Sequence, residues 1–332
     1  MRSVLTLLLG QIAILAMPLF ATEISVESME VKIDEHPLHV SFWGEKNALQ
    51  KPWVVLISGP IDSWHSDSAW FAASAPILAQ HYRVIAIDRA ATVVNLADAP
   101  VGYTHFALDL NLTLQHFNIQ NATLVAFASS NISAQIALQE NREKRVSNVV
   151  LIDPDVLSEF SIARYNQDAL PFKNNLEKYL TYISQHKYSA RVKQKNQADL
   201  EKLTSLSTLA TTNWQYVTKL MDKRLEIHNQ KNLFIEIANY HQDLQQAAKL
   251  VWPQHIPTVI IDTQFEDSYI AQTDNQEQKA GLIKWQKDGT EYYQRLVRLS
   301  DQNRYLTTPS KAHLFQFERP FELLSIIQQL RE

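Results

Sequence analysis

The sequence predicts an α/β protein with a mostly parallel central sheet, flanking helices and an inserted helical cap. Short continuous runs of Val, Ile and Leu are typical of strands that are covered on both faces, as in a parallel sheet. Helical segments lie between successive runs, which indicates strand–helix–strand crossovers. A polar, helix-rich stretch interrupts this alternation at roughly Ser158–Leu250. We therefore expect one sheet covered on both faces, with a cap inserted between two of its strands.

The expected strands and helices follow one another along the chain. The stretch Ile24–Gly44 alternates apolar and polar residues, which predicts an antiparallel pair leading into the sheet. The parallel strands are expected at Trp53–Gly59, Tyr82–Asp88, Ala122–Ala128, Val146–Asp153, Ile256–Asp262 and, more weakly, Asn303–Thr308. The helices between them are expected at Ala69–His81, Thr104–Phe117 and Asn131–Lys144.

The cap is predicted from apolar residues that recur every three or four positions. Leu176, Tyr179, Leu180 and Ile183 are one such set, and this spacing is typical of an amphipathic helix. We expect four regions: a signal peptide (1–21), the first part of the core (22–157), the cap (158–250) and the second part of the core (251–332).

Composition excludes several classes of site. The 332 residues include no cysteine, so disulfides, thiolate zinc sites and cysteine nucleophiles are excluded. The net charge is −4 and no basic cluster interleaves with aromatic residues, which argues against nucleic-acid binding. No His-Glu-x-x-His motif and no phosphate-cradling glycine loop occurs. We therefore expect no metal and no cofactor.

The N-terminus predicts export. Arg2 precedes an apolar run, and small residues end it, which is typical of a signal peptide cleaved after Ala21. An uncleaved anchor is the alternative, but the run from Val4 to Phe20 is short for a bilayer and contains Pro18. We expect a secreted or periplasmic protein with no stable membrane anchor after cleavage.

The layout resembles the α/β-hydrolase fold. The most specific piece is "HLFQFERPFELLSII", in which His313 precedes Pro320 at the offset seen in that family. "HYRVIAIDRA" and "VSNVVLIDPD" are similar to the family's fourth and sixth strands. The resemblance implies a nucleophile after the fifth strand, a cap after the sixth, an acid after the seventh and a histidine after the eighth. It implies that His313 is the catalytic base, a role that histidine fills near neutral pH.

The resemblance also implies a carboxylate that orients the histidine. The segment "PTVIIDTQFEDSYI" offers three, and the family spacing falls on Glu266, with Asp267 next. Asp262 lies too early, at the end of the strand. Asp155 is a further alternative, because some members of the family place the acid after the sixth strand.

The nucleophile turn is expected in "VAFASSNIS", where small residues should flank the nucleophile by two positions. With Ala128 in the central position the flanking residues fit, but the turn then has no hydroxyl. With Ser129, the bulky Phe127 is a poor fit, although the spacing to the next strand fits better. With Ser130, Ala128 is small but Ile132 is not. A helix N-cap explains the serines without catalysis.

The resemblance also implies an oxyanion hole, and the sequence departs from the usual pattern there as it does at the nucleophile turn. With Ser129 as nucleophile, the N–H of Ser130 would supply one donor. In "SGPIDSWH", Pro60 occupies the usual position of the other donor and has no N–H. The N–H of Ile61, or the hydroxyl of Ser58 or Ser63, is the expected substitute.

Two functions follow from the resemblance. The first is an exported serine hydrolase that cleaves an ester, amide or other acyl bond of a small or medium apolar substrate. Cap aromatics would favour such a substrate: Tyr165, Phe172, Tyr179, Tyr182 and Trp214. The second is an inactive relative that serves as a binding or partner-docking module.

Overall fold

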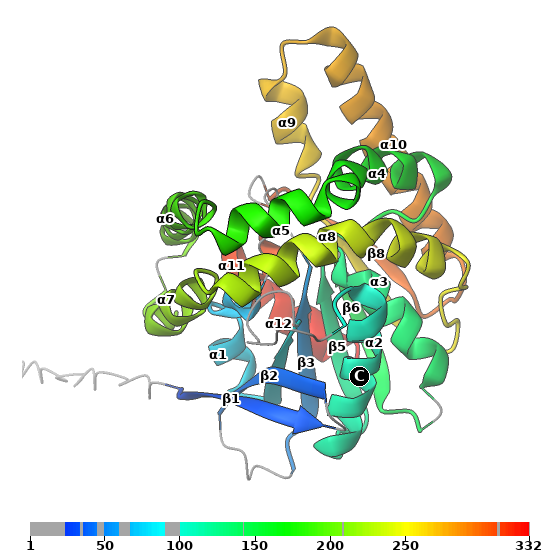
Figure 1. Cartoon of the computed structure of the whole chain (residues 1–332). Helices are drawn as coiled ribbons and strands as arrows, with labels where there is room; N and C mark the ends of the chain where they lie inside the picture. Colours follow the sequence, from blue (N-terminus) through cyan, green and yellow to red (C-terminus); the bar gives the residue numbers. More distant parts are fainter. Residues whose placement is uncertain are drawn as a thin grey trace, which may run out of the picture.

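An eight-stranded sheet runs through the centre of the protein (Figure 1). The structure is a computed structural model, and it describes residues 24–33, 36–44, 50–59, 67–89, 100–141, 143–207, 209–310 and 313–331. The predicted signal peptide, Ile61 and Ser63 lie outside these residues.

The strand order is β1-β2-β4-β3-β5-β6-β7-β8. The first two strands are antiparallel to each other, and β2 is antiparallel to β4, while the pairs from β4 to β8 are all parallel. The predicted sheet and its antiparallel entry are confirmed. The strands are β1 (Val26–Ile33), β2 (His36–Trp43), β3 (Trp53–Ser58), β4 (Arg83–Asp88), β5 (Ala122–Phe127), β6 (Val146–Ile152), β7 (Thr258–Asp262) and β8 (Arg304–Thr307).

Strand register brings the ends of the parallel strands to one edge. Phe127, the last residue of β5, pairs with Ser58 at the end of β3 and with Ile152 at the end of β6. Asp262 at the end of β7 pairs with Thr307 at the end of β8. The turns that follow these strands therefore meet at the carboxyl edge of the sheet, where ligands bind in open α/β sheets.

Alternate residues of each strand enter two different cores, as the pleat requires. Leu56, Val125 and Val150 belong to the core on one face, and Val55, Leu124 and Val149 to the core on the other. The first core is covered by the 3₁₀ turn η1 (Ser68–Phe71), α1 (Ala75–Leu78), α11 (Phe315–Glu318) and α12 (Pro320–Gln329). The second is covered by α2 (Tyr103–His116), α3 (Ser130–Ala137), which runs into the 3₁₀ turn η2 (Leu138–Glu140), and α10 (Gln276–Val297).

The predicted helix Ala69–His81 is instead two short pieces, η1 and α1. Pro76 lies in the first turn of α1, where its missing N–H costs nothing, and it cannot continue a helix that begins earlier.

Five helices lie between β6 and β7 in the residues that the structure describes. They are α4 (Glu159–Asn174), α5 (Leu176–Ser184), α6 (Ser189–Leu206), α7 (Trp214–Lys223) and α8 (Ile227–Ala248). Figure 1 shows α4, α5 and α8 crossing above the carboxyl edge of the sheet. One buried ion pair joins this layer to the sheet: Arg89, directly after β4, binds both carboxylate oxygens of Glu236 on α8 at 2.8 Å.

Two further helices, α9 (Glu266–Gln272) and α10, follow β7 and form a hairpin that projects beyond the rest of the molecule (Figure 1). The sequence patterns did not predict α10. Its buried residues, Gly289, Tyr293 and Leu296, are confined to its second half, so its first half carries little apolar periodicity. None of the helices in the described part of the chain has the length and hydropathy needed to cross a membrane.

Candidate functional site at the carboxyl edge of the sheet

The chain turns sharply between β5 and α3, and Ala128 lies at the centre of the turn. Its φ of 50° is in the left-handed region, which costs a residue with a side chain roughly 1 kcal/mol. Its N–H donates to the carbonyl of Ile152 at 2.9 Å, which fixes the turn against β6. A strained residue between a strand and a helix has the geometry of a nucleophile elbow. Here that position carries a methyl group and no hydroxyl.

Gly59 packs directly against this turn. Its N–H donates to the carbonyl of Phe127 at 2.7 Å. A Cβ at this position would lie 2.3 Å from the nitrogen of Ser129 and 2.5 Å from that of Ser130. Only glycine permits so close an approach. The turn after β3 and the first amides of α3 therefore meet where the fold would place an oxyanion hole, and the second expected donor, Ile61, lies outside the described residues.

The two serines point to different partners. Ser129 is helical, with φ −57° and ψ −10°, and its Oγ lies 3.2 Å from the hydroxyl of Tyr240 on α8. Ser130 donates to two main-chain carbonyls, those of Phe127 at 2.8 Å and Ile57 at 3.1 Å. The Ser130 hydroxyl thus supports the turn, whereas Ser129 faces the cap.

His313 lies after β8 and is held by aromatic rings. Its imidazole stacks on Phe265 with ring centroids 3.8 Å apart and 8° between the planes, and its edge contacts Phe127. Its Nε2 is 3.3 Å from Oδ2 of Asp153. The imidazole is therefore at the carboxyl edge, beside the carboxylate of the residue that follows β6.

Asp153 is a site residue that the sequence patterns missed. The "LID" that ends β6 was assigned to the strand, and the alternative acid in that region was Asp155. In the structure Asp153 lies just after the strand with a φ of 44°, and it accepts bonds from the N–H (2.7 Å) and the hydroxyl (2.6 Å) of Thr263. Burial raises the pKa of Asp153 well above its usual value, although both bonds from Thr263 act in the opposite direction.

Of the predicted acids, Glu266 and Asp155 face the same space as His313, and Asp267 does not. Glu266 is 8 % exposed, its Oε2 has no hydrogen-bond partner, and burial raises its pKa to about 7. Asp155 accepts a bond from the hydroxyl of Tyr240, and burial raises its pKa to about 6. The exposed Asp267 instead accepts a bond from Gln286 at 2.8 Å.

These residues line a cavity of about 750 Å³, which we call the edge cavity. Its floor is the carboxyl edge of the sheet, and its walls come from α4, α8, α9 and α10. Of the predicted site residues, it brings together Ser129, Asp155, Glu266 and His313; Ser130 and Asp267 are not among its lining residues. The apolar and aromatic walls are Val156, Tyr165, Phe172, Tyr240, Phe265, Tyr269, Leu282, Trp285 and Tyr293.

Three residues that line this cavity have a left-handed backbone. Ala128, Asp153 and His313, which follow β5, β6 and β8, have a φ between 44° and 53°. Left-handed residues other than glycine are costly and tend to gather at functional sites. The described residues contain no group of three or more His, Asp or Glu side chains that could hold a metal ion.

Comparison with known proteins identifies the architecture. No family model and no curated protein matches the sequence. Among solved structures, the chain is similar to an α/β-hydrolase-fold protein from Burkholderia ambifaria (TM-score 0.55, 16% identity, covering 91% of this chain and 97% of that one). It is also similar to a loop variant of the haloalkane dehalogenase of Bradyrhizobium elkanii (TM-score 0.58, 12% identity, covering 92% of this chain and 97% of that one). A third similar structure is the enol-lactonase of Burkholderia xenovorans LB400 (TM-score 0.52, 14% identity, covering 91% of this chain and 99% of that one). At these identities the likeness is one of fold.

Proposed function

The chain has the α/β-hydrolase fold, and we propose that it uses the edge cavity to bind a small, mostly apolar molecule without forming a covalent intermediate. The observation that carries this proposal is Ala128 at the strained elbow position. Acyl transfer by a serine hydrolase needs an oxygen nucleophile at that point. A methyl group cannot attack a carbonyl carbon, so the neighbouring imidazole has no elbow hydroxyl to activate.

The cavity supports the choice of ligand. A volume of about 750 Å³ lies in the range of pockets that enclose small organic molecules, roughly 300–1,000 Å³. Its walls are rich in aromatic residues, and charged groups lie both on the floor and on the walls, where α4 contributes Arg164 and Asp168 and α9 contributes Glu266. The aromatic surface favours a ligand with an apolar body, and the charged groups would fix its polar end.

Binding can be tested by filling the cavity. Thr273, the residue after α9, lines the edge cavity and is half-buried, so Thr273→Trp would occupy the space from its rim. Its neighbour Asp274 is exposed and does not line the cavity, so Asp274→Trp is the matched control. A panel of small apolar compounds is screened by thermal shift and calorimetry. We expect compounds that bind the wild type and Asp274→Trp but not Thr273→Trp; the absence of any such compound would contradict the proposal.

The lack of a nucleophile has its own test, with a fluorophosphonate probe. We expect no labelling of the wild type. We expect labelling of Ala128→Ser, because the new hydroxyl would lie at the elbow, close to the imidazole of His313. Ala128→Gly is the matched control: it changes the same position, relieves the left-handed strain and adds no hydroxyl.

Ser129-dependent hydrolysis is the second candidate, favoured by the fact that Ser129 and His313 line the same cavity. It predicts labelling of the wild type that is lost in Ser129→Ala and retained in Ser130→Ala, together with turnover of short p-nitrophenyl esters. That result would replace the binding proposal with an acyl hydrolase acting on an ester, amide or similar bond.

We also propose that the protein is exported, from the pattern of residues 1–21. Mass spectrometry of the protein from its native cell tests this. A mature chain that begins at Thr22 supports export, and an intact N-terminus in a cytoplasmic fraction contradicts it.

A further inference from the structure

A second, smaller pocket lies at the opposite end of the sheet from the edge cavity. It has a volume of about 160 Å³. Trp53 at the start of β3 and Arg83 and Val84 at the start of β4 line it. We call it the Arg83 pocket. Its remaining lining residues are Met29 of β1, Phe42, Trp43 and Gly44 at the end of β2, and Phe117 at the end of α2.

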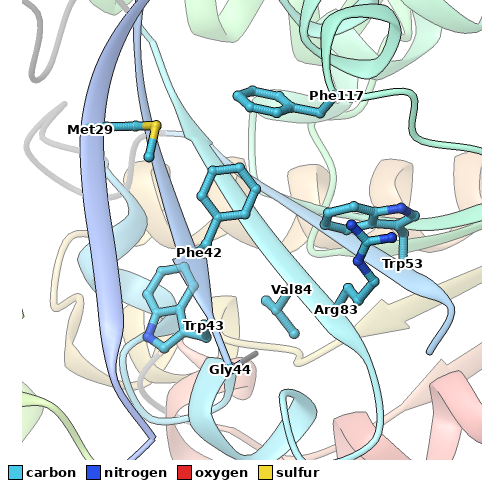
Figure 2. Close-up of a pocket in the computed structure, with 8 residues that line it drawn as sticks. All are labelled: Met29, Phe42, Trp43, Gly44, Trp53, Arg83, Val84 and Phe117. Atoms are coloured by element: carbon cyan, nitrogen blue, oxygen red, sulfur yellow. The ribbon is translucent and has the colours of Figure 1, made fainter. Parts of the chain in front are cut away.

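The walls of the Arg83 pocket are aromatic. Phe42 contacts Phe117 edge-on, with ring centroids 5.1 Å apart, and lies 6.4 Å from the ring of Trp53. Figure 2 shows Met29 and Phe42 on one side of the hollow and Trp53 with Arg83 on the other. For scale, an apolar cavity of about 150 Å³ in another protein takes up benzene. The space therefore suits a single aromatic ring.

Arg83 is the only charged residue among the described residues that line this pocket. The centre of its guanidinium lies 3.8 Å from the ring centroid of Trp53, which is cation–π stacking. Its Nε is buried and has no hydrogen-bond partner, and no carboxylate of the described residues is paired with it. Burial alone lowers the pKa of Arg83, with no neighbouring anion to oppose it. A buried N–H without an acceptor costs roughly 1–3 kcal/mol, so this group calls for a partner.

We propose that the Arg83 pocket binds a small aromatic monocarboxylate. The ring would lie among Phe42, Trp53 and Phe117, and the carboxylate would accept from the guanidinium. Arginine is suited to this role because its planar donors match a carboxylate while its face remains stacked on an aromatic ring. The site is separate from the edge cavity, and the inference does not depend on the function proposed for that cavity.

Isothermal calorimetry with three probes of similar shape tests the charge requirement: benzoate, benzyl alcohol and benzylamine. We expect benzoate to bind, benzyl alcohol to bind at least tenfold more weakly, and benzylamine not to bind. Arg83→Gln should weaken benzoate binding at least tenfold. Arg298→Gln makes the same change at an exposed arginine and should leave binding unchanged. Equal binding of the acid and the alcohol, or benzoate binding retained in Arg83→Gln, would overturn the proposal.

Two further variants test where benzoate binds, and they do not depend on the folding of Arg83→Gln. Phe117→Trp would fill the pocket from its half-buried rim and should abolish benzoate binding, and it decides the question if Arg83→Gln does not fold. Thr273→Trp fills only the edge cavity and should leave benzoate binding intact. Benzoate binding lost in Thr273→Trp, or retained in Phe117→Trp, would assign it elsewhere.

Discussion

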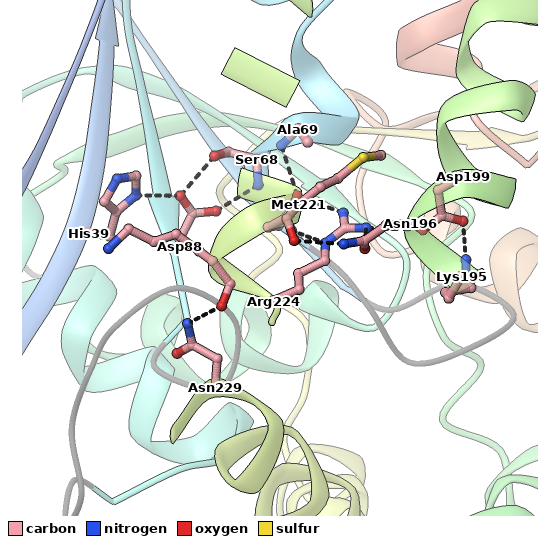
Figure 3. Close-up of polar contacts among 12 residues, drawn as sticks. His39, Ser68, Ala69, Asp88, Lys195, Asn196, Asp199, Met221, Arg224 and Asn229 are labelled. Atoms are coloured by element: carbon pink, nitrogen blue, oxygen red, sulfur yellow. Dashed lines mark hydrogen bonds and ion pairs between the residues drawn. The ribbon is translucent and has the colours of Figure 1, made fainter. Parts of the chain in front are cut away.

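Besides the Arg89–Glu236 ion pair, the cap helices meet the core at two places that differ in how buried charge is neutralised. At the first, which we call the α7 anchor, Arg224 at the end of α7 binds Asp67 at 2.7 Å and Asp199 at 3.0 Å. Arg224 and Asp199 are labelled in Figure 3. All three side chains are at most 3 % exposed. Beside them, the carboxylate of Asp88 accepts from the N–H and the hydroxyl of Ser68. Every charge of this cluster has an opposite charge or a donor.

At the second place, the edge cavity, the polar groups retain bonding capacity. Oε2 of Glu266 is buried without a partner. Asp155 is held by a hydroxyl of the cap, that of Tyr240, and no cation is paired with it among the described residues. Burial therefore raises the pKa of both carboxyls, whereas in the α7 anchor burial is offset by paired charge.

The pairing of buried charges distinguishes the α7 anchor, a contact that stabilises the fold, from the edge cavity, a site that can bind a ligand. A fully paired buried cluster fixes one arrangement of the cap, and removing any member leaves an uncompensated charge. A buried carboxyl without a partner lowers stability, and such costs are usual where a ligand completes the bonding. The α7 anchor thus holds the cap in place, and the edge cavity is the part that a ligand can change.

The largest expected effect is the loss of the α7 anchor. Arg224→Met leaves the buried Asp67 without its cation, while Asp199 keeps its ion pair with Lys195, so we expect the free energy of unfolding to fall by about 3–5 kcal/mol. Urea denaturation followed by circular dichroism measures this. Arg298→Met, at an exposed position, should change stability by less than about 0.5 kcal/mol. Equal values for the two variants would show that the anchor does not stabilise the cap.

The next effect concerns Glu266 and depends on pH. The folded pKa of about 7 exceeds the unfolded value of 4.5, so between these values the folded state holds a proton that the unfolded state has lost. The stabilisation of the folded state by the Glu266 side chain is therefore complete below pH 4.5 and is lost as the pH rises through 7. Glu266→Gln removes this loss, so relative to the wild type the variant should gain about 2–3 kcal/mol between pH 4 and pH 8.

Urea denaturation at a series of pH values measures that gain. Glu277→Gln, at an exposed position of α10, is the matched control and should show no such trend. A stability difference between Glu266→Gln and wild type that does not vary with pH would mean that Glu266 titrates normally.

A smaller effect is expected at the carboxylate beside His313. Thr263→Val removes the hydroxyl that donates to Asp153 at 2.6 Å but keeps the N–H, so we expect a loss of about 1–2 kcal/mol. Thr218→Val, an exposed position on α7, is the control and should be close to neutral. A neutral result at Thr263 would mean that this bond does not help to hold Asp153 in place.

The fold could be predicted because its signals are local. Continuous apolar runs identify strands buried on both faces, and the described strands begin and end within two residues of the expected bounds, as with Ile256–Asp262 and β7 (Thr258–Asp262). The α10 helix escaped prediction because its buried residues occupy only its second half. Its first half instead contacts α9 and α4, and no local pattern records such contacts.

The candidate site was less predictable because it depends on backbone conformation and on pairing between strands. Composition could not choose between Ala128, Ser129 and Ser130, and only the left-handed φ at Ala128 distinguishes the centre of the turn. Asp153 read as the end of a strand, and only the register of β6 and β7 brings it to Thr263 and His313. Glu266 was predicted from the family spacing after the strand, and it does line the edge cavity, while its role toward His313 stays a prediction.

The smallest effect tests whether the paired serines are equivalent. The hydroxyl of Ser129 forms a long bond with Tyr240 and interacts with Asp155 and Tyr103, all of them side chains that face the cavity or the cap, so Ser129→Ala should cost less than about 1 kcal/mol. Ser130 donates to two buried carbonyls that hold the turn, so Ser130→Ala should cost more, about 1–2 kcal/mol. The two variants remove the same atom from adjacent residues, which makes each the control of the other in a thermal denaturation experiment. If Ser129→Ala proved the more costly, the Ser129 hydroxyl would belong with the fully paired groups of the anchor, and the contrast between the two places would be weaker than the structure indicates.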